Sequence, residues 1–423
     1  MSATQEKSGS PSSNAQTGIF FTKQPILDKK RRIWGYELLG AELREGIFNV
    51  FSQQESSASL ASTAYLGLQG AMERGKKVAV AFDAKSILDG APYALPPGHG
   101  VLRVLAGAAR QPEVLESLQD MRQQGYLVSI DLDPGSVDQG LCAQADILVQ
   151  DFASARVNGL AEQAAQTKTQ LLVRGVQSIE QFEKARDMGF TLYQGGFFKE
   201  PEPMPGRKLS SSHVSRINLF QLMESEDPDF KKLAAVIGPD VSISFRLLSY
   251  LNSPFFGLSR KIQSIDQAIA LLGWNKLKTW LRAVIIADMA GQEEVPQELA
   301  ALSLQRARFF ELLSTEYDWW GFQPNTLFLV GIFSLLDVIL GMQMKDLAEK
   351  LPLDPRLKAA LCRDAKSEYL PLFNLLSAFE DGDWESLETQ TRQLGLELEQ
   401  VKAFHAQARD WSEAFFSQPN QAQ

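Results

Sequence analysis

Residues Tyr126 to Asp131 read YLVSID, a short apolar run that ends in an aspartate. Such a run is typical of a strand buried on both faces of a parallel sheet. Helical stretches that end in glycine, such as EVLESLQDMRQQG (Glu113–Gly125), separate it from similar runs. These runs are KVAVAF (Lys77–Phe82), VLRVLA (Val101–Ala106), DILVQ (Asp146–Gln150), QLLVRG (Gln170–Gly175) and TLYQG (Thr191–Gly195). The alternation predicts strands and helices in turn, as in α/β proteins.

The N-terminal pair of runs differs from the others. GIFFTKQPI (Gly18–Ile26) and RIWGYELLG (Arg32–Gly40) are joined only by the polar link LDKKR. A link this short suits an antiparallel hairpin, because a parallel connection needs a dozen or more residues. Together the runs predict a TIM-like (β/α) barrel of about eight strands with an antiparallel first strand pair.

The pattern changes after KEPEPMPGRK (Lys199–Lys208), a proline-rich break that we interpret as the domain boundary. Beyond it the apolar residues recur at helical spacing, and no convincing strand follows. Near the C-terminus they are Leu398, Val401, Phe404, Ala408, Trp411 and Phe415. The chain is therefore predicted to be α/β plus all-α, with a disordered tail (1–17), a barrel (18–205) and an all-helical domain (206–423). Because proline stiffens the short junction, we expect the two domains to pack against each other.

Composition narrows the class of protein. The 423 residues are enough for two domains, and a net charge of −9 argues against wrapping nucleic acid. Cys142 and Cys362 are too few for a disulfide framework, which favours a cytoplasmic protein. The apolar run Thr326–Met342 is shorter than a membrane span needs and contains Asp337, so it predicts a buried core helix.

Few residues suggest catalysis. No phosphate-binding loop or nucleophile motif is present, and the three histidines are too dispersed for a metal site. Glu37, Asp83 and Asp131 follow or end predicted strands, where barrel enzymes place their chemistry. The alternative is that these carboxylates cap loops or helices.

Two segments resemble the EAL domain, a barrel that hydrolyses cyclic di-GMP. QPILDKKRRIWGYELLG (Gln24–Gly40) is similar to the opening of that domain, and LYQGGFFKEP (Leu192–Pro201) to its closing segment. The second half resembles the HDOD domain, an all-helical relative of HD phosphohydrolases. The matching stretches are DVSISFRLLSYLNSPFFG (Asp240–Gly257) and IQSIDQAIALLGWNKLKTW (Ile262–Trp280).

The EAL resemblance implies a site that has lost most of its ligands. Glu37, Asp131 and Gln194 match family residues that remain, and Glu37 corresponds to the first metal-binding glutamate. In that family, carboxylates and one asparagine hold two divalent metals that activate water. The replaced positions are Ala41, Ala81, Arg103, Leu132, Val149, Arg174 and Gln177. We therefore expect a degenerate EAL-like barrel with no metal or cofactor.

Arg103 and Arg174 replace acidic positions of the family, and their positive charge would repel Mg²⁺. One interpretation is that they pair with Glu37 and Asp131 as a structural network in the barrel mouth. The other is that they contact an anion, including a nucleotide phosphate.

The HDOD resemblance implies a parallel loss. Ser334 and Leu335 stand where an active HD domain has its His-Asp dyad. The surviving motif is Asn252-Ser253-Pro254, whose alternatives are a helix end and a ligand contact. The aromatic pairs Phe255-Phe256 and Trp319-Trp320 are candidates for a partner surface or for the core.

These features lead us to expect a non-catalytic bacterial signal-transduction protein related to cyclic di-GMP signalling. It would act through contacts with other signalling proteins, made by the HDOD domain. The alternatives are a receptor that binds cyclic di-GMP without hydrolysis and an active phosphodiesterase. A homo-oligomer is compatible with the sequence, and neither a nucleic acid partner nor a membrane span is expected.

Overall fold

The computed structural model of the chain describes residues 20–44, 47–49, 71–72, 74–133, 139–155, 164, 166–202, 208–225, 233, 237, 267, 273–317 and 321–416. The predicted tail (1–17), the Asn252–Pro254 motif and both candidate aromatic pairs lie outside these residues.

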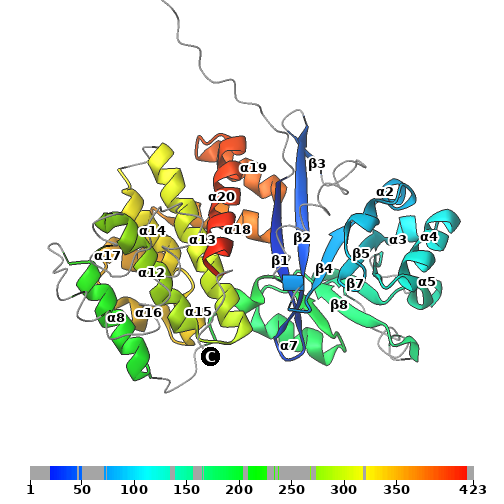
Figure 1. The fold of residues 1–423 in the computed structure, drawn as a ribbon, viewed down its shortest axis with the longest axis horizontal. Coiled ribbons are helices and arrows are strands. Elements are labelled where there is room, and N and C mark those ends of the chain that lie inside the picture. The colour runs from blue at the N-terminus through cyan, green and yellow to red at the C-terminus, as the bar shows by residue number, and fades with distance from the viewer. Residues whose placement is uncertain are drawn as a thin grey trace, which may run out of the picture.

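The N-terminal domain is a closed barrel (Figure 1). Its eight strands are β1 (Phe20–Asp28), β2 (Ile33–Arg44), β4 (Lys77–Ala81), β5 (Gly100–Leu105), β6 (Leu127–Asp131), β7 (Ile147–Asp151), β8 (Gln170–Arg174) and β9 (Leu192–Gln194). β1 runs antiparallel to both β2 and β9, and every other pair in the ring is parallel. The predicted TIM-like barrel with an antiparallel first pair is confirmed. A further short strand, β3 (Ile47–Asn49), pairs with the end of β2 and was not predicted.

The hairpin that makes the barrel unusual has a local cause. The Asp28 carboxylate accepts hydrogen bonds from the backbone N–H groups of Lys30 (2.8 Å) and Arg32 (2.9 Å). Arg31 adopts a left-handed φ of 57°, which reverses the chain between the two strands. The polar link therefore folds as a tight turn, and β1 returns directly alongside β2.

Apolar side chains fill the barrel interior. They are Ile26, Ala79, Val101, Ile147, Val149, Leu172 and Leu192. The intervening strand residues, such as Val80 and Val128, point outward into a second apolar cluster. The covering helices are α2 (Ala84–Leu88), α3 (Ala106–Ala109), α4 (Pro112–Gln123), α5 (Gln139–Gln144) and α7 (Ile179–Asp187). Because the centre is packed, any site of this barrel must lie at its mouth.

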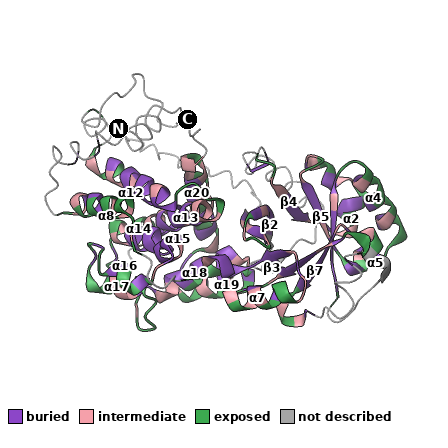
Figure 2. Cartoon of the chain, turned by 90° about the horizontal axis from the view of Figure 1, so that it is seen from below, coloured by how far each residue is buried: buried purple, intermediate pink, exposed green. Residues whose placement is uncertain are grey.

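In the described part beyond residue 208 the chain is helical. The helices are α8 (Ser211–Met223), α12 (Trp274–Ala290), α13 (Glu294–Glu316), α14 (Pro324–Phe333), α15 (Leu336–Leu340), α16 (Met344–Ala348), α17 (Pro355–Leu361), α18 (Leu370–Asp381), α19 (Trp384–Gln393) and α20 (Leu398–Phe416). Figure 2 shows buried residues concentrated in α13, α14 and α15. Gly331 lets α13 and α14 approach, because a Cβ there would lie 2.4 Å from the Ala307 backbone.

The apolar run Thr326–Met342 is buried as predicted, but the prediction of one helix was wrong. It forms two helices, α14 and α15, which separate at Ser334 and Leu335. The Ser334 hydroxyl donates to the Gly331 carbonyl (2.7 Å) and accepts from Arg306 (3.0 Å), so polar contacts stabilise the break. Among the described residues, no helix combines the length and apolar character that crossing a membrane requires.

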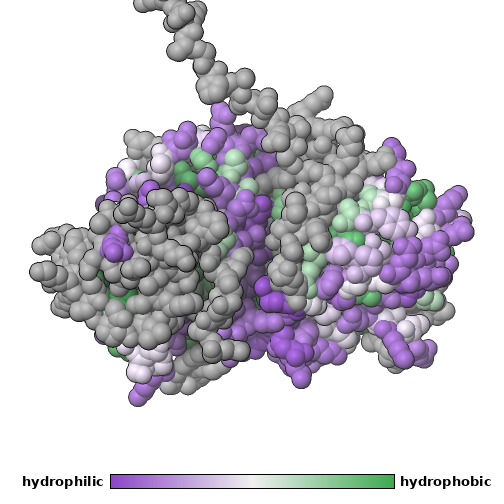
Figure 3. Space-filling model, viewed as in Figure 1, coloured by the Kyte–Doolittle hydropathy of each residue, from purple (hydrophilic) through white to green (hydrophobic). Residues whose placement is uncertain are grey.

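The two domains pack against each other, as the short junction predicted. The Tyr36 hydroxyl donates to Glu298 (2.9 Å), and Lys76 donates to Glu294 (2.7 Å). Arg409 lies over the Phe21 ring, 4.0 Å from its centroid. Hydrophilic residues accordingly line the junction between the domains in Figure 3.

Candidate functional site at the barrel mouth

Polar side chains from separate strands meet at the mouth of the barrel. Parallel strands end at the same rim, so residues near their carboxyl ends converge there. The structure brings together the residues that the sequence singled out, namely Glu37 (β2), Arg103 (β5), Asp131 (β6), Arg174 (β8) and Gln194 (β9). Asp83 does not join them, because its carboxylate caps α2 by accepting from the Ser86 N–H (2.7 Å).

The Arg103 guanidinium lies between the two buried carboxylates. Its Nε and Nη2 donate to the two oxygens of Asp131 at 2.9 and 2.6 Å. Its Nη1 donates to Oε1 of Glu37 in a short contact. The other Glu37 oxygen accepts from Nε2 of Gln194 at 2.6 Å. The side chains of Glu37, Asp131 and Arg103 are only 3%, 10% and 15% exposed, so solvent screens these contacts little.

Arg174 forms the outer layer of the network. Its Nη1 lies 3.4 Å from Asp131 Oδ2, and its Nη2 lies 3.2 Å from Asp151 Oδ1. Sequence reasoning missed Asp151, although it directly follows the predicted strand Asp146–Gln150 and ends β7. The mouth thus holds two arginines facing three carboxylates.

Burial and neighbouring charges shift the pKa values of Arg103 and Asp131 in opposite directions. Burial disfavours a charged guanidinium, but Glu37 and Asp131 outweigh that effect and raise the pKa of Arg103 above its usual range. Burial raises the pKa of the Asp131 carboxyl, and Arg103 opposes this shift. Arg103 is therefore a permanent cation at the centre of the mouth.

This donor set does not fit a two-metal centre. Both Asp131 oxygens and Oε1 of Glu37, which a metal would need, face the guanidinium instead. Neighbouring Val149 and Leu132 are apolar and supply no ligand. Within the described ranges, no group of three or more His, Cys, Asp or Glu is placed to hold a metal ion.

The helical domain has a comparable cluster that the sequence did not reveal. Arg306 on α13 donates to both oxygens of Glu380 on α18, at 2.6 and 2.8 Å, and also to Ser334. Ser334 is one of the two predicted dyad positions. Nearby, burial raises the pKa of the Asp337 carboxyl to about 6. His405, fully buried, stacks on Phe379 and lies apart from His99 and His213.

Sequence comparisons identify the helical half and find relatives that span nearly the whole chain. The family model of the HDOD domain matches residues 209–336. The chain is 30% identical over 409 residues to "Cyclic di-GMP phosphodiesterase CdgJ" of Vibrio cholerae, covering 93% of this chain and 92% of that protein. It is 28% identical over 414 residues to "Uncharacterized protein YuxH" of Bacillus subtilis, covering 93% and 98%.

Similar solved structures include an EAL domain protein from Listeria monocytogenes (TM-score 0.37, 18% identity, covering 43% of this chain and 88% of that one). Another is the EAL domain of Mycobacterium smegmatis DcpA (TM-score 0.35, 17% identity, covering 42% and 90%).

The fold and the mouth define a two-domain protein with an EAL-type barrel followed by an HDOD domain. The chain belongs to the EAL–HDOD family that includes the Vibrio cholerae relative. Through this relative, the family is connected with cyclic di-GMP signalling.

Proposed function

We propose that this chain is a non-catalytic signal-transduction protein of the cyclic di-GMP network that acts through protein contacts. The observation that carries the proposal is the position of Arg103 between Glu37 and Asp131. A metal-assisted hydrolysis needs several carboxylate charges directed at divalent cations. In this barrel mouth the carboxylates of Glu37 and Asp131 pair with Arg103 instead.

Displacing Arg103 would be unfavourable. A metal ion could reach Glu37 and Asp131 only after their contacts with the guanidinium break, which leaves a buried charge without its partner. Breaking a buried ion pair costs on the order of 3–5 kcal/mol. By the EAL resemblance, Ala81 and Val149 also lack the asparagine amide and the lysine that catalysis uses.

The test is hydrolysis of cyclic di-GMP by the purified full chain with Mg²⁺ or Mn²⁺. The Vibrio cholerae relative is named a cyclic di-GMP phosphodiesterase, so the assay determines whether this chain shares that activity. We expect the wild type and a Glu37→Ala variant to show the same background rate. Turnover clearly above the Glu37→Ala rate would overturn the proposal.

A receptor that binds cyclic di-GMP without cleavage is the second candidate. The observation in its favour is Arg174, whose side chain is 23% exposed and contacts Asp131 and the exposed Asp151 at 3.4 and 3.2 Å. A rotation toward solvent would let this guanidinium contact a phosphate. At 100 times its dissociation constant, the nucleotide would stabilise the fold by about 2.7 kcal/mol. A thermal shift that disappears in Arg174→Ala would support the receptor, and no shift would exclude it.

We assign partner binding to the helical domain. By the HDOD resemblance, Ser334 and Leu335 stand at the dyad positions, and Ser334 forms hydrogen bonds with Arg306 and the Gly331 carbonyl. In-cell cross-linking of the tagged full chain with mass spectrometry tests this. We expect partner cross-links from helical-domain lysines such as the exposed Lys366. Cross-links confined to barrel lysines would contradict the assignment.

A further inference from the structure

The segment that closes the barrel connects the mouth to the helical domain. Gln194, at the end of β9, donates to Glu37 inside the mouth. The next residues form the 3₁₀ helix η3 (Gly196–Lys199), whose last residue faces the other domain. Gln194 contacts the site, and Lys199, five positions later in the sequence, contacts the helical domain.

Backbone contacts hold this segment firmly to the loop after β8. The Val176 N–H donates to the Gln194 carbonyl, and the Phe197 N–H donates to the Val176 carbonyl, both at 3.1 Å. Gly195 has a φ of 142°, and a Cβ there would lie 2.1 Å from the Val176 carbonyl oxygen. The Phe197 ring is fully buried and stacks on Phe182, with centroids 5.0 Å apart. Residues Gln194 to Phe197 are therefore packed as one unit with the loop after β8.

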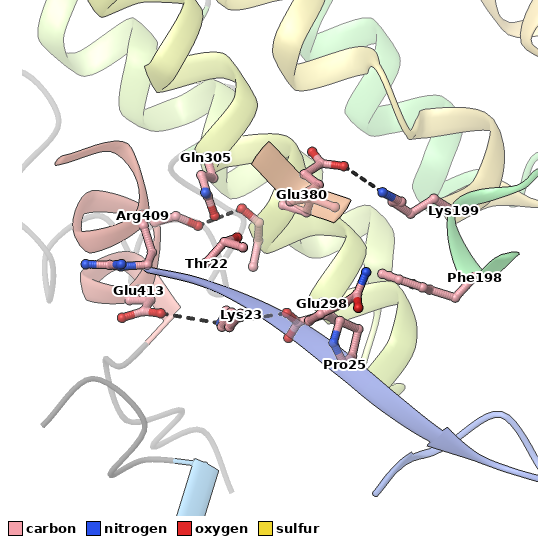
Figure 4. Close-up of a pocket in the computed structure, with 14 residues that line it drawn as sticks. Thr22, Lys23, Pro25, Phe198, Lys199, Glu298, Gln305, Glu380, Arg409 and Glu413 are labelled. Carbon is pink, nitrogen blue, oxygen red and sulfur yellow. Dashed lines mark hydrogen bonds and ion pairs between the residues drawn. The ribbon is translucent and has the colours of Figure 1, made fainter. Parts of the chain in front are cut away.

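At the far end, Lys199 enters the buried ion cluster of the helical domain. Its Nζ donates to Glu380 at 2.9 Å and lies 3.4 Å from Asp381. Figure 4 shows Lys199 directed from the barrel segment toward Glu380, across the cavity between the domains. The same Glu380 carboxylate accepts both bonds from Arg306, which in turn reaches Ser334.

The Glu380 carboxylate stays ionised in this cluster. Burial opposes the ionised form of Glu380, but Arg306 and Lys199 outweigh it and hold the pKa of this carboxyl well below its usual range. Because Glu380 is only 7% exposed, a shift of Lys199 changes the field at a site where water screens little. The position of Lys199 thus bears directly on how α13 and α18 are held together.

We propose that residues Gln194 to Lys199 couple the state of the barrel mouth to the Arg306–Glu380 pair of the helical domain, with Lys199 as the positioning residue. The inference holds whether or not the barrel hydrolyses a nucleotide, since it concerns only how a change at the mouth is transmitted.

The experiment is hydrogen exchange followed by mass spectrometry on α18 in the full-length protein. Gln194→Ala removes the contact with Glu37 and serves as the perturbation of the mouth. We expect it to speed exchange in α18 about tenfold, the size typical of side chains coupled within one network. In a Lys199→Met background the same perturbation should leave α18 unchanged.

Lys76→Met is the matched control. Lys76 also bridges the domains, to Glu294 on α13, but it precedes β4 and does not follow Gln194. In this background we expect the response of α18 to Gln194→Ala to persist. Lys199→Leu, which also removes the charge and the hydrogen-bond donor, replaces Lys199→Met if the latter does not fold.

Three results would overturn the proposal. The first is no change in α18 on Gln194→Ala in the wild type. The second is a response that survives in the Lys199 variant. The third is a response lost equally in Lys76→Met, which would mean that any interdomain ion pair suffices.

Discussion

Replacing Arg103 by Met removes the cation that holds the barrel mouth together. Glu37 and Asp131 would then be left facing each other, with side chains that are 3% and 10% exposed. Removing one partner of a buried ion pair destabilises a protein by about 3–5 kcal/mol. For a domain of this size, each 1 kcal/mol shifts the melting temperature by roughly 2–4 °C, so we expect a decrease of roughly 6–20 °C.

The unfolding free energy lost on Arg103→Met should become smaller as the pH falls. Burial already raises the pKa of Asp131 in the wild type, and without Arg103 the opposing effect disappears. A carboxyl whose pKa is raised on folding is destabilising when ionised, so its penalty falls as the pH falls. The difference between wild type and Arg103→Met should therefore narrow from pH 7 to pH 5.

Calorimetry of the barrel transition in the full chain measures both effects. Arg32→Met is the matched control, because Arg32 pairs with Asp28 at 2.7 Å but is 67% exposed. Such a surface pair contributes at most about 1 kcal/mol. If Arg103→Met is no more destabilising than Arg32→Met, or if its loss grows toward pH 5, the reasoning about the mouth is wrong.

Two further predictions concern the helical domain. Glu380→Gln leaves Arg306 and Lys199 without their shared partner, and should cost about 3–5 kcal/mol at pH 7 in urea unfolding. The folded-state pKa of Glu380 is lowered from 4.5, so its ionised carboxylate stabilises the fold above that pH. The unfolding free energies of the wild type and Glu380→Gln should therefore become more similar in more acidic solution. Burial lowers the pKa of His405 from 6.5 to about 3. The unfolded chain therefore takes up a proton that the folded protein does not, and the wild type loses stability as the pH falls below 6.5. Relative to wild type, His405→Phe should therefore gain about 2 kcal/mol in unfolding free energy between pH 7 and pH 5.

Most of the barrel could be predicted because its strands are continuous apolar runs. The run Lys77–Phe82 became β4 (Lys77–Ala81), and Gln170–Gly175 became β8 (Gln170–Arg174). β3 could not be predicted, since its three residues depend on an extension of β2 for pairing. The split between α14 and α15 also escaped prediction, because the contact from Arg306 to Ser334 crosses from another helix.

The site was partly predictable for a similar reason. Strand ends converge in any parallel barrel, so the meeting of Glu37, Arg103 and Asp131 followed from their places in the sequence. Lys199 lies in the EAL-like closing segment and at the start of the proline-rich boundary, and its partner Glu380 lies 181 residues away. No local pattern reports such a pairing, because it depends on how the two domains pack.

We infer that the Arg103 guanidinium takes the place of metal ions between Glu37 and Asp131. Titration of the untagged full chain with Mn²⁺, followed by electron paramagnetic resonance of the free ion, tests this inference. We predict that wild type and Glu37→Ala leave the same amount of Mn²⁺ free at every concentration. Stoichiometric Mn²⁺ binding by the wild type that is lost in Glu37→Ala would contradict the claim.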